Sequence, residues 1–286
     1  MLSLTQLTVL AAVARHGSVT GAAKELHYTQ PAVSHHLARL EAATGAKLIQ
    51  RAGRGIRLTP EGELLAARAA EIVGRVDAAT TELAARVGLR AGRVRMAGFQ
   101  SILSTIVPKA AAALARAHPG IELGLVDVHP VEALRLLRAG RVDVALIFRH
   151  TGAPREEDGF RLVHLLDDPI HLVTSEPGQT IANHRDSAWI GGCERCQDEL
   201  ITICGRAGFT PRISVVSDDM VVMQTLAAAR MGVTTLPGLA LRAHREPGIH
   251  TTELPGHRRR IYAVTYGEPP DPPATTALIH AIQASI

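Results

Sequence analysis

The stretch Ser18–Leu58, SVTGAAKELHYTQPAVSHHLARLEAATGAKLIQRAGRGIRL, decides how the amino-terminal part of the chain folds. Two short helical patterns meet across the turn His27-Tyr28, and a basic segment that contains glycine follows them. Thr29 is placed to cap the second helix, and Pro31 falls in its first turn, where a missing N–H costs little. The pattern predicts a helix-turn-helix followed by a hairpin wing.

The second helix of this pair has two chemically different faces. Val33, Leu37 and Leu40 repeat at helical spacing and predict the buried face. The outward side chains suit a DNA major groove, because an amide such as that of Gln30 can bind an adenine edge. Together with the wing arginines, which suit phosphate or the minor groove, the predicted DNA-binding set is Thr29, Gln30, Pro31, Ser34, His35, Arg39, Arg51, Arg54 and Arg57.

Charge is concentrated in the same segment. Residues 1–59 carry seven basic and two acidic side chains, whereas the whole chain has a formal net charge of only +4. The remainder is therefore close to neutral. A small basic domain attached to a neutral body is typical of a protein that binds a polyanion through that domain alone.

The run from Ser18 to Glu63 resembles the amino-terminal domain of LysR-type transcriptional regulators. The shared residues are Ser18, Ala22-Ala23, Leu26, Thr29-Gln30-Pro31-Ala32-Val33-Ser34, Leu40-Glu41, Gly45, Leu48, Arg51, Leu58-Thr59-Pro60 and Gly62. The resemblance implies a winged helix-turn-helix that contacts promoter DNA through Gln30, Pro31, Ser34 and the wing arginines. One departure is His35-His36, because the family usually has arginine directly after the serine.

A long helix is predicted after Thr59-Pro60-Glu61, which has the order of a cap, a first-turn proline and an early acid. Apolar residues follow at alternating spacings of four and three, which predicts a coiled-coil seam; they are Leu65, Ala69, Ile72, Val76, Ala79 and Leu83. A seam this short can also pack on its own domain. In the family the corresponding helix joins two chains.

From Arg93 onward strand-like and helix-like segments alternate, which predicts an α/β architecture. Among them are a helix at about 104–117 and separate strands at 162–166, 170–174, 249–254 and 261–265. The resemblance implies an effector domain of two α/β lobes similar to periplasmic binding proteins. The expected division is a winged helix-turn-helix at 1–59, a linker helix at 60–88 and an effector domain at 93–286. Within the last, lobe I covers about 93–164 plus 266–286, and lobe II covers about 165–265.

Ligands of two-lobed α/β folds bind where helix N-termini and strand ends face the cleft. Three segments meet this condition: Gly98–Thr105, the strand end at Phe148-Arg149, and the helix start at Ser217–Asp219. The predicted effector-binding set is Ser101, Ser104, Thr105, Phe148, Arg149, Cys193, Ser217, Asp218 and Asp219. Each of these polar residues also fits a simple helix cap. Asp218 and Asp219 would repel an anion unless Arg149 or Arg195 offsets them, which leaves neutral or cationic effectors open.

Three cysteines, Cys193, Cys196 and Cys204, lie close together in the sequence. An odd number does not make a disulfide framework. The peroxide-sensing branch of the resembled family has its two thiols in this region, and Cys204 matches the second of them, but Arg195 stands at the first position. Inert thiols, a thiol-based redox sensor and a metal sensor all stay open as alternatives.

Other classes of protein find little support in the sequence. It has no P-loop, nucleophile elbow or plausible catalytic triad, and a pure solute-binding module would not need the basic amino-terminal domain. No signal peptide or membrane-spanning run is evident, so a cytoplasmic location is expected. We therefore expect a DNA-binding regulator that is not an enzyme and needs no cofactor or metal. Its expected partners are double-stranded promoter DNA, an unknown small-molecule effector and further copies of itself as a homodimer or homotetramer, and RNA polymerase stays open as another.

Overall fold

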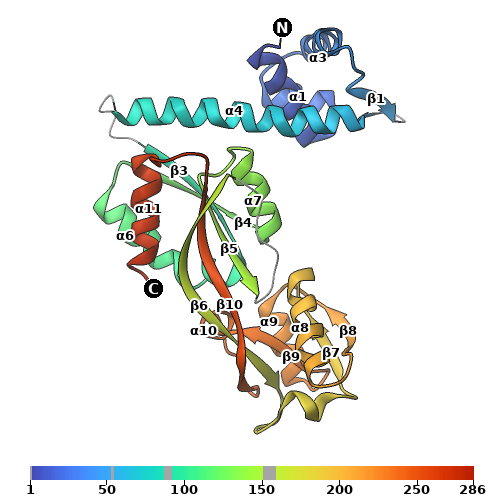
Figure 1. The fold of residues 1–286 in the computed structure, drawn as a ribbon, viewed down its shortest axis with the longest axis vertical. Coiled ribbons are helices and arrows are strands. Elements are labelled where there is room, and N and C mark those ends of the chain that lie inside the picture. Colours follow the sequence, from blue (N-terminus) through green and yellow to red (C-terminus); the bar gives the residue numbers. More distant parts are fainter. Residues whose placement is uncertain (1, 53–54, 87–91, 151–158) are drawn as a thin grey trace.

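The computed structural model describes residues 2–52, 55–86, 92–150 and 159–286. Figure 1 shows three parts in sequence order: a helical amino-terminal domain, a long helix α4, and an elongated α/β domain on the other side of that helix. The α/β domain consists of two lobes joined by long strands. The predicted fold class, a winged helix-turn-helix with a linker helix and a two-lobed α/β body, is confirmed.

The amino-terminal domain is a winged helix-turn-helix. Its elements are α1 (Leu4–His16), α2 (Val19–Glu25), α3 (Gln30–Thr44), β1 (Ile49–Ala52) and β2 (Gly55–Leu58). The hydroxyls of Ser3, Ser18 and Thr29 accept backbone N–H bonds at the three helix starts, as helix caps do. Gly17 ends α1 in the left-handed conformation, with φ of 59°. The core joins Val9, Leu10, Val33, Leu37, Leu40 and Leu48.

One half-buried carboxylate fixes the wing to α3. Glu41 accepts hydrogen bonds from the backbone N–H of Leu48 at 2.8 Å and of Ile49 at 3.3 Å, and from Lys47 Nζ at 3.0 Å. Burial by itself would raise the pKa of Glu41, but these donors hold that pKa below its ordinary value. The start of β1 is therefore set by a side chain near the end of α3.

The linker helix α4 (Pro60–Arg86) begins where the sequence predicts, with the Thr59 hydroxyl accepting from the N–H of Gly62 at 3.0 Å. The predicted seam divides into two parts. Ala69 is fully buried against Leu7 and Ala11 of α1, so the first turns pack on the chain's own DNA-binding domain. The later apolar side chains Ile72, Val76 and Leu83 are exposed, as is Leu64.

The α/β domain is built on one mixed sheet with strand order β4-β3-β5-β10-β6-β9. Its strands are β3 (Gly92–Gly98), β4 (Ile121–Asp127), β5 (Val144–His150), β6 (Phe160–Thr174), β9 (Thr234–Pro237) and β10 (His250–Tyr266). In lobe I, β3 is parallel to β4 and β5, and β10 is antiparallel to β5. Helices α5 (Gln100–Leu103), α6 (Val107–Ala117) and α11 (Pro273–Gln283) pack in one apolar core, and α7 (Pro130–Arg138) packs in another.

Lobe II surrounds Trp189, the single tryptophan of the chain, which is fully buried. Its remaining elements are the 3-10 turn η1 (Ile181–His184), β7 (Ala188–Gly191), α8 (Glu194–Arg206), β8 (Arg212–Val216), α9 (Met220–Ala228) and α10 (Gly238–Ala243). Strands β7 and β8 form a separate parallel pair. A bridge between Trp189 and Val233 connects β7 to the segment that leads into β9.

Two expectations about strands were wrong. The sequence predicts separate strands at 162–166 and 170–174, and again at 249–254 and 261–265, but β6 and β10 are each continuous and run through both lobes. The polar residues that suggested interruptions face each other, since Asp168 pairs with Arg259 and Asp167 with Arg260. Opposite charges on directly facing strand residues stabilise the pairing of the two strands. Neither segment alone indicates this pairing.

The pairing partners of β10 show where one lobe passes into the other. Residues 259–264 of β10 pair with β5 of lobe I, whereas 250–253 pair with β6 where it meets β9 in lobe II. The predicted helix at about 104–117 begins three residues later, at Val107 of α6, and the separate short helix α5 precedes it. Pro108 lies in the first turn of α6 and has no N–H to continue a helix from Ser104.

Candidate DNA-binding surface and interlobe pocket

The outward face of α3 carries the predicted set of polar side chains. Thr29, Gln30, Pro31, Ser34, His35 and Arg39 are all exposed, while Val33, Leu37 and Leu40 between them are buried. Thr20 of α2 accepts a hydrogen bond from Gln30 Nε2 at 2.8 Å, which holds the amide at the start of α3. A preorganised amide at this place is suited to a base edge.

The two histidines of α3 are in different environments. His36 is half-buried and stacks on Tyr28, with ring centroids 5.8 Å apart. His35 is exposed beside Ser34. Of the two, therefore, only His35 lies on the same open face as the other predicted contacts.

The wing is a two-stranded antiparallel hairpin in which Arg51 faces Ile56 and Arg57 faces Gln50. The Arg57 side chain is exposed. The Arg51 side chain and all of Arg54, both predicted contacts, lie outside the described residues. Among its described residues the hairpin thus carries one exposed arginine, Arg57.

A pocket of about 90 Å³ lies between the lobes, where the three predicted segments meet. Lobe I contributes Ser101 from α5 and Phe148 from β5, and lobe II contributes Cys193 and Asp218. Other lining residues were missed by the sequence analysis; they are Phe99, Gln100, His129, Gly192, Cys196, Met220, Met223, Thr235, Leu236, Pro237, Ala240 and Arg259. The wall is mostly apolar with a few polar groups, as is usual for small-molecule sites.

Arg259 is the main residue that the sequence analysis missed. It is only 4% exposed and donates to Asp168 through Nε at 2.9 Å and Nη2 at 2.8 Å. Nη2 also donates to the Ser101 hydroxyl at 2.7 Å, and the guanidinium lies over the rings of Phe99 and Phe148. The available signal was three consecutive arginines, 258–260, inside an apolar strand pattern.

The counterion of Arg259 also contacts the other lobe. Asp168 is 2% exposed and accepts the backbone N–H of Leu239, the second residue of α10, at 3.0 Å. A buried ion pair is retained only where its remaining hydrogen bonds are satisfied. This one connects β6, β10, α5 and α10 around the base of the pocket.

A side-chain contact spans the lobes at the mouth of the pocket. His129, just before α7 of lobe I, lies 3.1 Å from Asp218 of lobe II, and both side chains are about half exposed. A second cavity of about 270 Å³ adjoins this mouth and is lined in part by His129, Asp218 and Asp219. Both predicted aspartates are thus near the opening, but only Asp218 lines the inner pocket.

The other predicted effector residues make local contacts. The hydroxyls of Ser104 and Thr105 donate to backbone carbonyls four residues earlier. Asp219 caps α9 by accepting from Val221 and Val222, and the Ser217 hydroxyl accepts from the N–H of Asp219. The Arg149 guanidinium lies 5.4 Å from the Tyr262 ring centroid and is not among the lining residues.

The thiols fall into two groups. Cys193 and Cys196 are half-buried in the pocket wall, with their sulfur atoms 2.6 Å apart. Cys204 is buried in the lobe II core beside Trp189, and burial raises its pKa to about 11. No cluster of three or more histidine, cysteine or acidic side chains within the described part of the chain is arranged to hold a metal ion.

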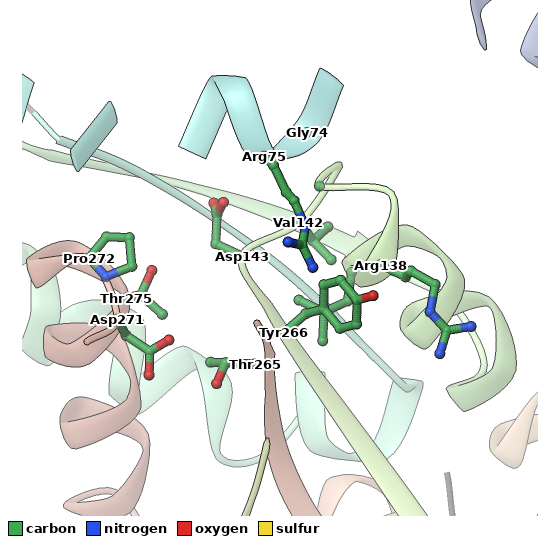
Figure 2. A pocket seen from close by; sticks show the side chains of 12 residues that line it. Gly74, Arg75, Arg138, Val142, Asp143, Thr265, Tyr266, Asp271, Pro272 and Thr275 are labelled. Carbon is green, nitrogen blue, oxygen red and sulfur yellow. The ribbon is translucent and has the colours of Figure 1, made fainter. Parts of the chain in front are cut away.

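A further pocket of about 90 Å³ lies where α4 crosses lobe I (Figure 2). Arg75 of α4 points toward Tyr266 of β10, with the guanidinium 5.5 Å from the ring centroid. Beside it, Gly74 and Gly140 are in backbone contact, and a Cβ on Gly74 would lie 2.5 Å from Gly140 Cα. The linker helix is therefore packed directly on the effector domain.

Across the described ranges, no helix is both long and apolar enough to cross a membrane.

Comparison with known proteins agrees with this geometry. Residues 4–63 match the family model of the bacterial regulatory helix-turn-helix protein, lysR family, and residues 88–286 match that of the LysR substrate binding domain. The regulator TfdS of Cupriavidus pinatubonensis is 29% identical over 87% of this chain and 86% of its own length. A probable hydrogen peroxide-inducible genes activator of Mycobacterium avium is 28% identical over 84% of this chain and 79% of its own.

Solved structures show the same fold over the whole length. A full-length OxyR variant from Pseudomonas aeruginosa superimposes with a TM-score of 0.76 at 21% identity, covering 100% of this chain and 96% of that one. ArgP from Mycobacterium tuberculosis gives a TM-score of 0.72 at 20% identity, covering 100% and 97%. With both of its domains matched by family models, the chain belongs to the LysR family of DNA-binding transcriptional regulators that carry an effector-binding domain.

Proposed function

We propose that two copies of this chain read an interrupted dyad in promoter DNA, each through the exposed face of α3 and its wing. The observation that carries the proposal is the set of exposed polar side chains at the start and along α3, opposite its buried apolar face; they are Thr29, Gln30, Ser34, His35 and Arg39. Gln30, Ser34 and His35 supply base or phosphate contacts, and Arg39 with the wing arginines supplies phosphate contacts.

The exposed stripe of α4 supports a homo-oligomer. Leu64, Ile72, Val76 and Leu83 leave large apolar side chains in water in a single chain, and Leu64 and Leu83 are about two-thirds exposed. Pairing this helix with that of a second copy would bury them, and the spacing of the two DNA-binding domains would then follow from the dimer. A homotetramer built from two such dimers also fits this surface.

The interlobe pocket is the proposed effector site, and its charges disfavour an anionic effector. Arg259 is neutralised by Asp168, and His129 faces Asp218. A buried anionic ligand would find no cation in this wall that is not already paired, and burying an unpaired charge is costly. We infer a small, mostly apolar molecule with one or two hydrogen-bonding groups, held by Ser101 and the apolar wall.

The contact between α4 and lobe I provides the path from effector to DNA. Because Gly74 and Gly140 touch through their backbones, a shift of lobe I would move the linker helix. In this proposal the protein acts as a regulator in the cytoplasm and catalyses no reaction. A turnover screen with purified protein is expected to give no activity.

Selection from a pool of random DNA duplexes tests the DNA-binding proposal directly. Full-length protein should enrich an interrupted dyad, and affinity for it should fall steeply with salt as counterions are released. Arg57→Ala should weaken binding to all duplexes and reduce the salt slope by about one. Gln30→Ala should relax base preference with little change of slope. Failure of the wild-type protein to enrich any sequence would overturn the proposal.

A thermal-shift screen tests the effector class. Matched pairs of small amides and carboxylates of the same skeleton should show stabilisation by the uncharged members only, and Ser101→Ala should reduce that shift while operator binding is retained. Stabilisation by carboxylates alone would contradict the inferred charge preference.

A further inference from the structure

Cys193 and Cys196 lie on the first turn of α8 in a C-x-x-C arrangement. Cys193 precedes the first helical residue and Cys196 is three positions later, so both side chains project from the same side of the helix. Their sulfur atoms are 2.6 Å apart, close to bonding distance and much closer than two unrelated thiols. Only a small movement separates this pair from a disulfide.

The two sulfur atoms are chemically different. The Cys196 thiol donates to Cys193, which holds the pKa of Cys193 at about 6, whereas the same contact and burial raise the pKa of Cys196. The start of α8 also favours a negative sulfur at Cys193. Near neutral pH, Cys193 is therefore the nucleophile and Cys196 the protonated partner.

Small molecules can reach these sulfur atoms through the pocket. Both residues are half-buried and line the interlobe cavity, together with Ser101, His129 and Asp218. The cavity of about 90 Å³ holds a few water-sized molecules. Cys204 lies in a different core and takes no part.

We propose that Cys193 and Cys196 form a reversible dithiol–disulfide couple in the pocket wall, which a small hydroperoxide oxidises. The Cys193 thiolate attacks the outer peroxide oxygen, the O–O bond breaks, and one proton is taken up, which gives a sulfenic acid and releases the alcohol or water. The Cys196 sulfur then attacks the Cys193 sulfur, the S–O bond breaks, and water leaves. Two electrons pass from the thiol pair to the peroxide.

This couple would make the effector site sensitive to redox state. Oxidation removes the negative charge of the Cys193 thiolate from the side of the pocket that faces His129 and Asp218. It also draws the start of α8 together beside Gly192, where a Cβ would already lie 3.2 Å from the Cys196 Cβ. The consequence for effector binding rests on the proposed function, but disulfide formation itself does not.

The experiment treats reduced full-length protein with hydrogen peroxide, alkylates the remaining thiols, and maps them by mass spectrometry. We expect the peptide containing Cys193 and Cys196 to be protected and two hydrogen atoms lighter, while Cys204 remains alkylated after denaturation. A thiol reductant should restore three alkylated cysteines. Retention of three free thiols, or a disulfide that includes Cys204, would overturn the proposal.

Three variants assign the roles. Cys196→Ser should trap the sulfenic acid, which a dimedone probe captures at Cys193, and Cys193→Ser should form neither disulfide nor sulfenic acid. Cys204→Ser is the matched control and should be oxidised like the wild-type protein. Binding of the reduced protein to its selected duplex is measured in the same samples. If that binding is normal while the thiols resist peroxide, this inference fails and the proposed function does not.

Discussion

The DNA-binding domain and the interlobe pocket are built in opposite ways. The surface of α3 comes from consecutive residues of one helix, and its supports, such as Thr29 and Glu41, lie within a few turns of sequence. The pocket joins residues as far apart as Ser101 and Arg259, which hydrogen bond across 158 positions. Local hydrogen bonds therefore specify the first site, and long-range pairing of charges in a sheet specifies the second.

The largest loss of stability is expected from removing Asp168, the counterion of Arg259 at the base of the pocket. Asp168→Ala would leave Arg259 buried without its counterion, and we expect a loss of about 3–5 kcal/mol in the free energy of unfolding. Urea denaturation followed by the fluorescence of Trp189, which reports on lobe II, measures this change. Asp167→Ala, at an exposed neighbouring position on the same strand, is the control and should cost less than about 1 kcal/mol. Equal effects of the two variants would show that the buried pair has no special role.

The contact between the linker helix α4 and lobe I should be the next most sensitive to substitution. Gly74→Ala would bring a methyl group 2.5 Å from Gly140 Cα, so the linker helix must move away from lobe I. Overpacking of this kind costs about 1–3 kcal/mol, which a thermal melt detects. Gly124→Ala, where the nearest atom to the new Cβ would be 3.4 Å away, is the matched control and should melt like the wild type. An unchanged melt of Gly74→Ala would mean that α4 does not rest on the loop at Gly140.

A local effect is expected from the carboxylate that fixes the wing. Glu41→Ala leaves the N–H groups of Leu48 and Ile49 without their acceptor, which should cost about 1–3 kcal/mol within the DNA-binding domain. Affinity for the selected duplex should fall, while the Trp189 fluorescence transition should stay in place. Lys47→Ala removes only the exposed partner and should preserve stability within about 0.5 kcal/mol. A shift of the Trp189 transition in Glu41→Ala would show that the two regions unfold together.

The smallest effect is expected for the protonation of the Cys193 thiol in the pocket wall. The pKa of Cys193 is lowered to about 6 by the Cys196 thiol, so its alkylation rate in the folded protein should rise through pH 6 and level off well below pH 9. Because this folded-state pKa lies below the unfolded value, the associated stability is present at high pH and declines as pH falls toward 6. Time-resolved alkylation with peptide mapping measures the profile. A midpoint near 9 would show that Cys196 does not stabilise the thiolate.

The difference between local and long-range contacts explains which residues of the interlobe pocket could be predicted from the sequence. Ser101, Phe148 and Asp218 were found because each lies near the end of a strand or the start of a helix, and such ends meet at the cleft of a two-lobed fold. Ser104, Thr105 and Asp219 satisfy the same rule, but their oxygen atoms bond to nearby backbone groups. Sequence position alone does not distinguish a cap from a ligand contact, since both use the same residue types.

The sequence by itself determined the winged helix-turn-helix, the start of α4 and the α/β class of the body, because caps, turns and apolar periodicity act over a few residues. Only the tertiary structure decided that β6 and β10 are continuous, that the first part of the α4 seam packs on α1, and that Arg259 lies at the base of the pocket. Each of these depends on a partner distant in sequence. A charged residue in a strand is stable only when the opposite charge faces it across the sheet, as Asp168 faces Arg259.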